Sequence, residues 1–204
     1  MKASQLQLPG TAPKRRARNA PRLGRPPNPG GPGQSHLKRP ALLGRRTPVH
    51  ATVRVREHVW NLRSKRCFIR ICAAIAKANL GLRVIHFAVL GNHLHLIVEA
   101  EDEKHLARAM QGLLISMAKR LNALMNRHGS VFADRYHAHA LATPTEVRNA
   151  IAYVLENFAR HFPDGAGGAD RFSSAAPDAP RHEPKTWLLR VGWRRARHTS
   201  GGHA

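Results

Sequence analysis

The stretch "HFAVLGNHLHLIVEA", residues 86–100, decides the fold because it reads as two strands joined by a Gly-Asn turn. In an extended chain, alternate side chains leave opposite faces, so Leu94, Leu96 and Val98 can enter a core together. Gly-Asn between apolar runs is typical of a two-residue hairpin turn with positive φ. The stretch therefore predicts an antiparallel β-hairpin with one buried face.

Two histidines interrupt the second strand of this hairpin. His93 and His95 lie two positions apart, so both imidazoles leave the face opposite the apolar one. Imidazole is a common metal ligand, and paired imidazoles indicate a ligand site, although two surface histidines are the alternative. Glu99 shares the histidine face. We expect a solvated charge at the strand end there, with an oxygen ligand or a group supporting the ligands as the alternative.

The remaining periodicity gives the order β-α-β-β-α-β-α. We predict strands in 50–57, 82–90, 93–99 and 131–141, and helices over 64–79, 102–127 and 143–161. Ser64 is the expected N-cap of the first helix, and Thr143 with Glu146 forms a capping box for the last. This order favours an α+β class, a ferredoxin-like antiparallel sheet with helices packed on one face.

The charge of the chain indicates a polyanionic partner. The 204 residues include 34 Lys and Arg against 12 Asp and Glu, a net charge of +22. Nucleic acid is the first candidate, because no basic amphipathic helix with bulky apolar anchors supports a membrane surface. No run is long enough to span a membrane, and the basic N-terminus lacks the apolar core of a secretory signal. We therefore expect a cytoplasmic protein without a membrane partner.

Composition divides the chain into three parts. Residues 1–48 are expected to be a disordered basic N-terminal arm, since "PKRRARNAPRLGRPPNPGGPGQSHLKRP" is rich in Pro, Gly and Arg and contains no acid. This arm is either simply solvated or in contact with DNA phosphates. Residues 49–162 are expected to form the folded domain, and 163–204 a loop-rich basic C-terminal tail. The tail contains an apolar and basic segment, "KTWLLRVGWRR", that the pattern does not place.

The last predicted helix carries a second set of functional candidates. Tyr153 and Asn157 are four residues apart, so one lies a turn above the other on the same helix face. We expect them beside the apolar stripe, at the sheet margin where the histidines emerge. Two imidazoles and an amide oxygen would give a metal three protein ligands, and a nearby phenol can act as a nucleophile.

Three segments carry a resemblance to a known family. "GNHLHLIVE", "GSVFADRYHAHAL" and "YVLENFARH", within roughly residues 49–161, resemble the single-tyrosine HUH transposases, and among them the REP-associated tyrosine transposases of the IS200-like group. The family motif, His-hydrophobic-His, corresponds to His93-Leu94-His95. By this resemblance Tyr153 is the catalytic tyrosine and Asn157 the third metal ligand. Glu156 departs from the pattern, since relatives often carry a neutral amide there.

The resemblance implies a specific chemistry. Such enzymes bind single-stranded DNA near a hairpin, use Mg²⁺ or Mn²⁺, and cleave by tyrosine attack to leave a 5′-phosphotyrosine and a free 3′-OH. The chain would then be an endonuclease and strand-transferase of DNA transposition. The alternatives are a non-catalytic DNA-binding protein of the same fold and a metal-dependent nuclease that uses water. Some relatives act as a homodimer and others alone, so the oligomeric state stays open.

A second His-x-His motif and several basic residues complete the candidates. In "RYHAHA", residues 135–140, Tyr136 points away from His137 and His139 on a strand, so these three cannot form one compact site. We expect Tyr136 to pack or to contact DNA. The candidate phosphate contacts, for which solubility is the alternative explanation, are Arg54, Arg56, Arg63, Lys65, Arg66 and Arg135.

Overall fold

The computed structural model describes residues 47–78, 81–161 and 170–196. These residues belong to one of the two compact units of the chain, Arg39–Ala204. The predicted basic arm, apart from its last two residues, lies outside the described part. None of the helices in the described ranges has the length and apolar character needed to cross a membrane.

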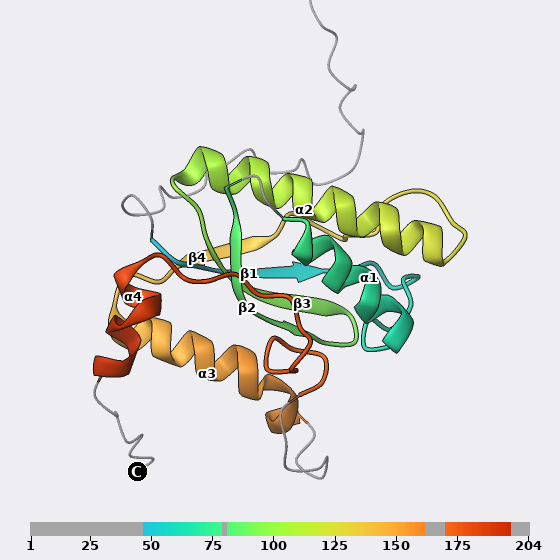
Figure 1. Ribbon diagram of the computed structural model, residues 1–204. Helices are drawn as coiled ribbons and strands as arrows, with labels where there is room; N and C mark the ends of the chain where they lie inside the picture. The colour runs from blue at the N-terminus through green and yellow to red at the C-terminus, as the bar shows by residue number, and fades with distance from the viewer. Residues whose placement is uncertain (1–46, 79–80, 162–169, 197–204) are drawn as a thin grey trace, which may run out of the picture. The chain divides into compact units, whose positions relative to one another are not determined.

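A four-stranded antiparallel sheet forms the centre of this unit (Figure 1). Its strands are β1 (Val49–Arg54), β2 (Arg83–Val89), β3 (His93–Glu99) and β4 (His137–Ala140). Their spatial order is β2-β3-β1-β4, so the histidine-bearing strand β3 is central and pairs with β1. The antiparallel α+β class predicted from the sequence is confirmed.

Helices cover both faces of the sheet, which corrects the expectation that they all pack on one face. Helices α1 (Lys65–Ala76) and α2 (Glu103–Leu124) lie together on one side, and α3 (Pro144–His161) packs on β2 and β3 from the other (Figure 1). The reason is that the sheet is apolar on both faces. Ile85 and Ile97 point away from the α1–α2 side and are buried against α3. An apolar face of this kind must be covered by another element.

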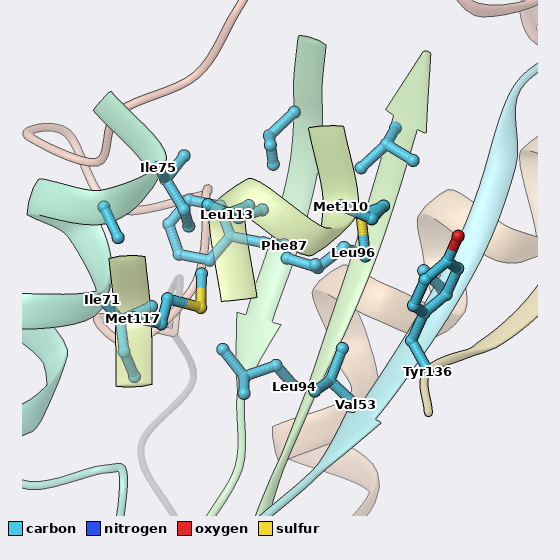
Figure 2. Close-up of a cluster of buried hydrophobic side chains, with 14 of the residues drawn as sticks. Val53, Ile71, Ile75, Phe87, Leu94, Leu96, Met110, Leu113, Met117 and Tyr136 are labelled. Atoms are coloured by element: carbon cyan, nitrogen blue, oxygen red, sulfur yellow. The ribbon is translucent and has the colours of Figure 1, made fainter. Parts of the chain in front are cut away.

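The core on the α1–α2 side contains the side chains that the hairpin pattern predicts. Leu94, Leu96 and Val98 are buried there with Phe87, and α2 contributes the residues that fill the space above them. Figure 2 shows Phe87, Leu94 and Leu96 together with three side chains of α2, namely Met110, Leu113 and Met117. Ile97, between Leu96 and Val98, is buried in the separate cluster against α3, so alternate residues of β3 face opposite sides as predicted.

Local capping signals are confirmed at two helices. The Ser64 hydroxyl accepts a hydrogen bond of 3.2 Å from the Cys67 amide at the start of α1. At α3 the Glu146 amide donates to Thr143 Oγ1 at 3.2 Å, and the Thr143 amide donates back to Glu146 Oε2 at 3.0 Å. This reciprocal pair is a capping box. It sets the first residue of the helix that carries Tyr153 and Asn157.

The turn of the central hairpin differs from the prediction. Neither Gly91 nor Asn92 has a positive φ. Their carbonyls instead accept hydrogen bonds of 2.9 Å from the amides of Leu62 and Val55 respectively. The turn conformation therefore depends on the loop that precedes α1 and not on the turn residues alone.

The described part of the predicted C-terminal tail packs along the free edge of β2. The Ser174 amide donates to Phe87 O at 2.8 Å, and the His182 amide donates to Val84 O at 2.9 Å. Two short helical turns follow, α4 (Trp187–Arg190) and η1 (Gly192–Arg195), both in contact with α3. The apolar and basic segment that the sequence left unplaced is thus docked on the domain.

Glu99 is fully buried, which contradicts the expected solvated charge. Its carboxylate accepts from Arg83 Nε at 3.1 Å, from the Lys185 amide at 2.8 Å and from the Thr186 amide at 2.9 Å. The Thr186 hydroxyl donates to it as well. With its oxygens used in this way, Glu99 joins the C-terminal segment to the sheet and is not available as an oxygen ligand.

Candidate active site

The candidate site lies between the sheet and α3. In antiparallel strands, directly opposed residues point to the same face. Thr52 of β1 is opposite His95 of β3, and Arg54 is opposite His93. His50 precedes Thr52 by two positions and therefore shares this face. The histidine face predicted from β3 alone thus continues onto the neighbouring strand.

His95 is the central side chain of the site and is only 4% exposed. Its Nδ1 lies 3.2 Å from His50 Nε2 and 3.2 Å from Thr52 Oγ1. Because Nδ1 is engaged by these two neighbours, Nε2 is the ring nitrogen through which His95 can bind a ligand. This arrangement is typical of metal-binding histidines, whose second nitrogen is held by a hydrogen bond.

His93 is half-buried and lies next to His95, with ring centroids 4.9 Å apart and ring planes at 89°. Its Nδ1 lies 2.7 Å from Asn92 Oδ1. An amide oxygen can only accept, so this bond places the hydrogen of His93 on Nδ1 and a lone pair on Nε2. Both imidazoles thus have Nδ1 in a hydrogen bond and Nε2 as the nitrogen that can bind a ligand.

Tyr153 of α3 packs against this pair of strands. Its ring centroid is 5.1 Å from that of His95, with an interplanar angle of 80°, and 5.8 Å from that of His50. The side chain is nevertheless 39% exposed, so a solvent-borne substrate can reach it. The structure therefore brings the predicted nucleophile to the predicted metal ligand His95 within one chain.

Asn157 follows Tyr153 by one helical turn and is only 2% exposed. Its Oδ1 is buried and accepts no hydrogen bond from the residues that the structure describes. An unsatisfied buried acceptor costs about 1–3 kcal/mol, so such an atom commonly serves a ligand. No group of three His, Cys, Asp or Glu in the described ranges could hold a metal ion. Within the described ranges His93 and His95 are therefore not joined by a third ligand of these four types, and the amide oxygen of Asn157 stays the predicted third ligand.

Burial lowers the pKa of His50 below its ordinary value, and the charge of His139 lowers it further. His139 is directly opposite His50 on β4, and His137 is opposite Thr52. Both are exposed, so this second His-x-His pair lies at the open side of the same face. Tyr136 is buried in the core on the other face, as Figure 2 shows. Its packing role and its separation from both histidines are confirmed.

The candidate phosphate contacts differ in exposure. Arg54 is exposed and directly opposite His93, which places it beside the site. Four more are also exposed, namely Arg56, Lys65, Arg66 and Arg135.

Arg63 does not fit a role in phosphate binding. It makes a two-pronged ion pair with Asp170, with both N–O distances 2.8 Å, and donates to Val89 O at 3.0 Å. Its guanidinium also lies 4.6 Å from the centroid of the Phe172 ring. These contacts hold the C-terminal segment against the loop before α1. They engage the Arg63 guanidinium within the fold, and this does not fit the predicted phosphate contact.

Sequence reasoning missed His50 and Thr52 as parts of the site. The alternation in "HATVRVRE" assigns both to the polar face of a strand, and in the structure both lie on that face but are half-buried. It does not reveal that this strand pairs with β3, because strand pairing is a non-local property. A His on the polar face of the strand just before the His-x-His hairpin is the signal that was available.

Comparison with solved structures found several similar chains, among them the following two. One is a REP-associated tyrosine transposase bound to a REP hairpin, with 16% identity and a TM-score of 0.49, covering 63% of this chain and 74% of that one. The other is described as "a putative transposase" from Deinococcus radiodurans R1, with 13% identity and a TM-score of 0.40, covering 65% of this chain and 100% of that one. The first bears the name of the family that the sequence resembles.

No family model matches the sequence, and none of the curated proteins compared with it is a significant match. At the identities of the two solved structures, similarity says nothing about the activity of this chain.

Proposed function

We propose that this chain is a metal-dependent, transposase-like enzyme that cuts and joins single-stranded DNA with Tyr153 as its nucleophile. The observation that supports this most strongly is the position of Tyr153, which is partly exposed and in ring contact with His95 of the same chain. If Tyr153 had only a packing role at the edge of the core, its ring would not require contact with two histidines. Because Tyr153 and His95 belong to the same chain, the contact also supports an active site formed by one protomer.

The residues present fit a divalent metal ion. His93, His95 and Asn157 would hold it, because each histidine has Nδ1 engaged elsewhere and Asn157 Oδ1 is a buried acceptor. A bound Mg²⁺ or Mn²⁺ would withdraw charge from a phosphate oxygen and make phosphorus a better electrophile. Two imidazole donors favour Mn²⁺ over Mg²⁺, which prefers oxygen ligands.

The proposed reaction exchanges one phosphate ester for another. Tyr153 Oη forms a bond to phosphorus, and the bond from phosphorus to the 3′ oxygen of the preceding nucleotide breaks. The phenol loses its proton and the departing 3′ oxygen gains one, so a free 3′-OH and a 5′-phosphotyrosine result. Because the ester bond is conserved in the adduct, a second 3′-OH can reverse the step and join two DNA ends.

Charge supports DNA as the partner. The net charge of +22 draws the chain to a phosphate backbone. Arg54, exposed and opposite His93, would contact a phosphate next to the one attacked. A single strand near a hairpin is the substrate that the family resemblance implies, and an unpaired strand can place its phosphate against α3 without unwinding.

The decisive experiment is capture of the covalent adduct. The protein is incubated with Mn²⁺ and a pool of labelled single-stranded hairpin oligonucleotides, and protein-linked DNA is detected after denaturation. Tyr153→Phe should lose the adduct completely. Tyr136→Phe is the matched control, since the chain has only two tyrosines and Tyr136 is buried in the core.

Each alternative gives a different result in this assay. If Tyr153→Phe still cuts DNA, water is the nucleophile and the chain is a nuclease. If the wild type binds the oligonucleotides but neither cuts nor attaches to them, the chain is a DNA-binding protein without catalysis. An adduct at Tyr136, or at any residue other than Tyr153, would also refute the proposal.

A further inference from the structure

We propose that His50 is a positioning residue that holds His95 in the form able to bind a metal ion. The inference rests on the proposed metal site, in which His95 is a ligand. It concerns a side chain outside the His-x-His motif and outside α3. His50 lies on β1, separated from His95 by 45 positions in sequence, and reaches it only through the pairing of β1 with β3.

The hydrogen bond between the two rings determines which nitrogen of His95 is available. A neutral imidazole carries one hydrogen, on Nδ1 or on Nε2, and only the other nitrogen can bind a metal. If the His95 hydrogen is on Nδ1, it can be donated to His50 Nε2, 3.2 Å away, and Nε2 of His95 keeps its lone pair. If the hydrogen is on Nε2, the metal site loses its central ligand.

Thr52 is the second group within reach of His95 Nδ1, with its hydroxyl oxygen also at 3.2 Å. A hydroxyl can donate or accept by rotating about its C–O bond, so it accommodates either form of His95. A neutral His50 that presents the lone pair of Nε2 accepts only, and so selects the Nδ1–H form.

His50 also contacts the proposed nucleophile. Its ring centroid is 5.2 Å from that of His95 and 5.8 Å from that of Tyr153, the latter at an interplanar angle of 66°. One side chain therefore packs against both the metal ligand and the phenol. Movement of the His50 ring would therefore shift both the His95 imidazole on the sheet and the Tyr153 phenol on α3.

The test uses variants that differ in where they place a hydrogen-bonding atom. In His50→Gln the side-chain amide lies near the position of imidazole Nε2, whereas in His50→Asn it lies near Nδ1 and does not reach His95. His139→Ala is the control, because it removes an exposed imidazole directly opposite His50 on the same face. Near-UV circular dichroism verifies that each variant is folded.

Two measurements are made on each protein. Long-range ¹H–¹⁵N spectra of the metal-free protein report which ring nitrogen of His95 carries hydrogen, with the signal assigned from a His95→Gln variant. Titration with Mn²⁺ gives the metal affinity. We expect Nδ1–H in the wild type, a mixture in His50→Asn with about 10- to 100-fold weaker Mn²⁺ binding, and substantial recovery of both in His50→Gln. His139→Ala should behave as the wild type.

The outcomes separate this inference from the proposed function. If His95 carries its hydrogen on Nε2 in the wild type, or if His50→Asn retains both the tautomer and the Mn²⁺ affinity, the inference is wrong, whatever the DNA assay shows. If the tautomer and affinity respond as expected but Tyr153 forms no adduct, the inference stands and the DNA-cutting proposal is wrong.

Discussion

Replacement of Glu99 by alanine should destabilise the protein strongly without touching the proposed catalytic residues. The Glu99 carboxylate is fully buried, and it accepts hydrogen bonds from Arg83, from the Lys185 amide and from both the amide and the hydroxyl of Thr186. Alanine would leave these donors unsatisfied and the Arg83 charge, itself mostly buried, without its partner. Removal of one member of a buried ion pair costs about 3–5 kcal/mol.

This cost can be measured as a change in the free energy of unfolding and in the melting temperature. For a chain of this size, 1 kcal/mol corresponds to about 2–4 °C, so Glu99→Ala should melt about 6–20 °C below the wild type. Glu99→Gln keeps the volume but loses the charge and places an amide donor near other donors. We expect it to lose about 1.5–3 kcal/mol, the worth of a hydrogen bond to a charged group.

Urea unfolding and limited trypsin digestion provide the assays. The exposed Glu101, two residues further along, is the control site, and Glu101→Ala should change stability by less than about 0.5 kcal/mol. Because Glu99 joins the C-terminal segment to β3, Glu99→Ala should also speed cleavage after Arg181 and Lys185. A loss of stability below about 1 kcal/mol, with unchanged cleavage at these two sites, would refute the role assigned to Glu99.

Two further predictions follow from the structure. Arg54→Gln should weaken binding to single-stranded DNA and lower the slope of log affinity against log salt concentration by about 1. Arg63→Gln should leave that slope unchanged and lower the melting temperature, because it removes the ion pair with Asp170. Equal slopes for the two variants would contradict this difference between Arg54 and Arg63. Burial raises the pKa of Cys72 to about 11, so its thiol stays protonated in the folded protein at pH 8. Alkylation by iodoacetamide at pH 8 should therefore be slow and should accelerate as pH approaches 11 or when urea unfolds the chain; rapid alkylation of the folded protein at pH 8 would count against it.

Features that depend on local chemistry could be predicted from the sequence. The two faces of β3 follow from strand alternation, because Leu94 and Leu96 must point opposite to His93 and His95 in any extended chain. The capping box at α3 follows for a similar reason, since its hydrogen bonds join residues three positions apart. The i, i+4 spacing of Tyr153 and Asn157 places both on one helix face in any fold.

Features that depend on which elements meet could not be predicted in this way. Glu99 reads as an exposed strand-end charge, and only the return of the distant segment at Lys185 and Thr186 buries it. Arg63 reads as one basic residue among many until Asp170 is placed beside it.

The sequence by itself determined the strand that carries the paired imidazoles and the helix that carries the phenol, because both are set by periodicity along the chain. Only the tertiary structure decided that α3 covers the histidine face, and that His50 of a neighbouring strand touches both His95 and Tyr153. The physical reason is that an apolar sheet face can be covered by any element of suitable shape. Packing over the whole molecule decides which element covers the face, and no local stretch of sequence specifies it.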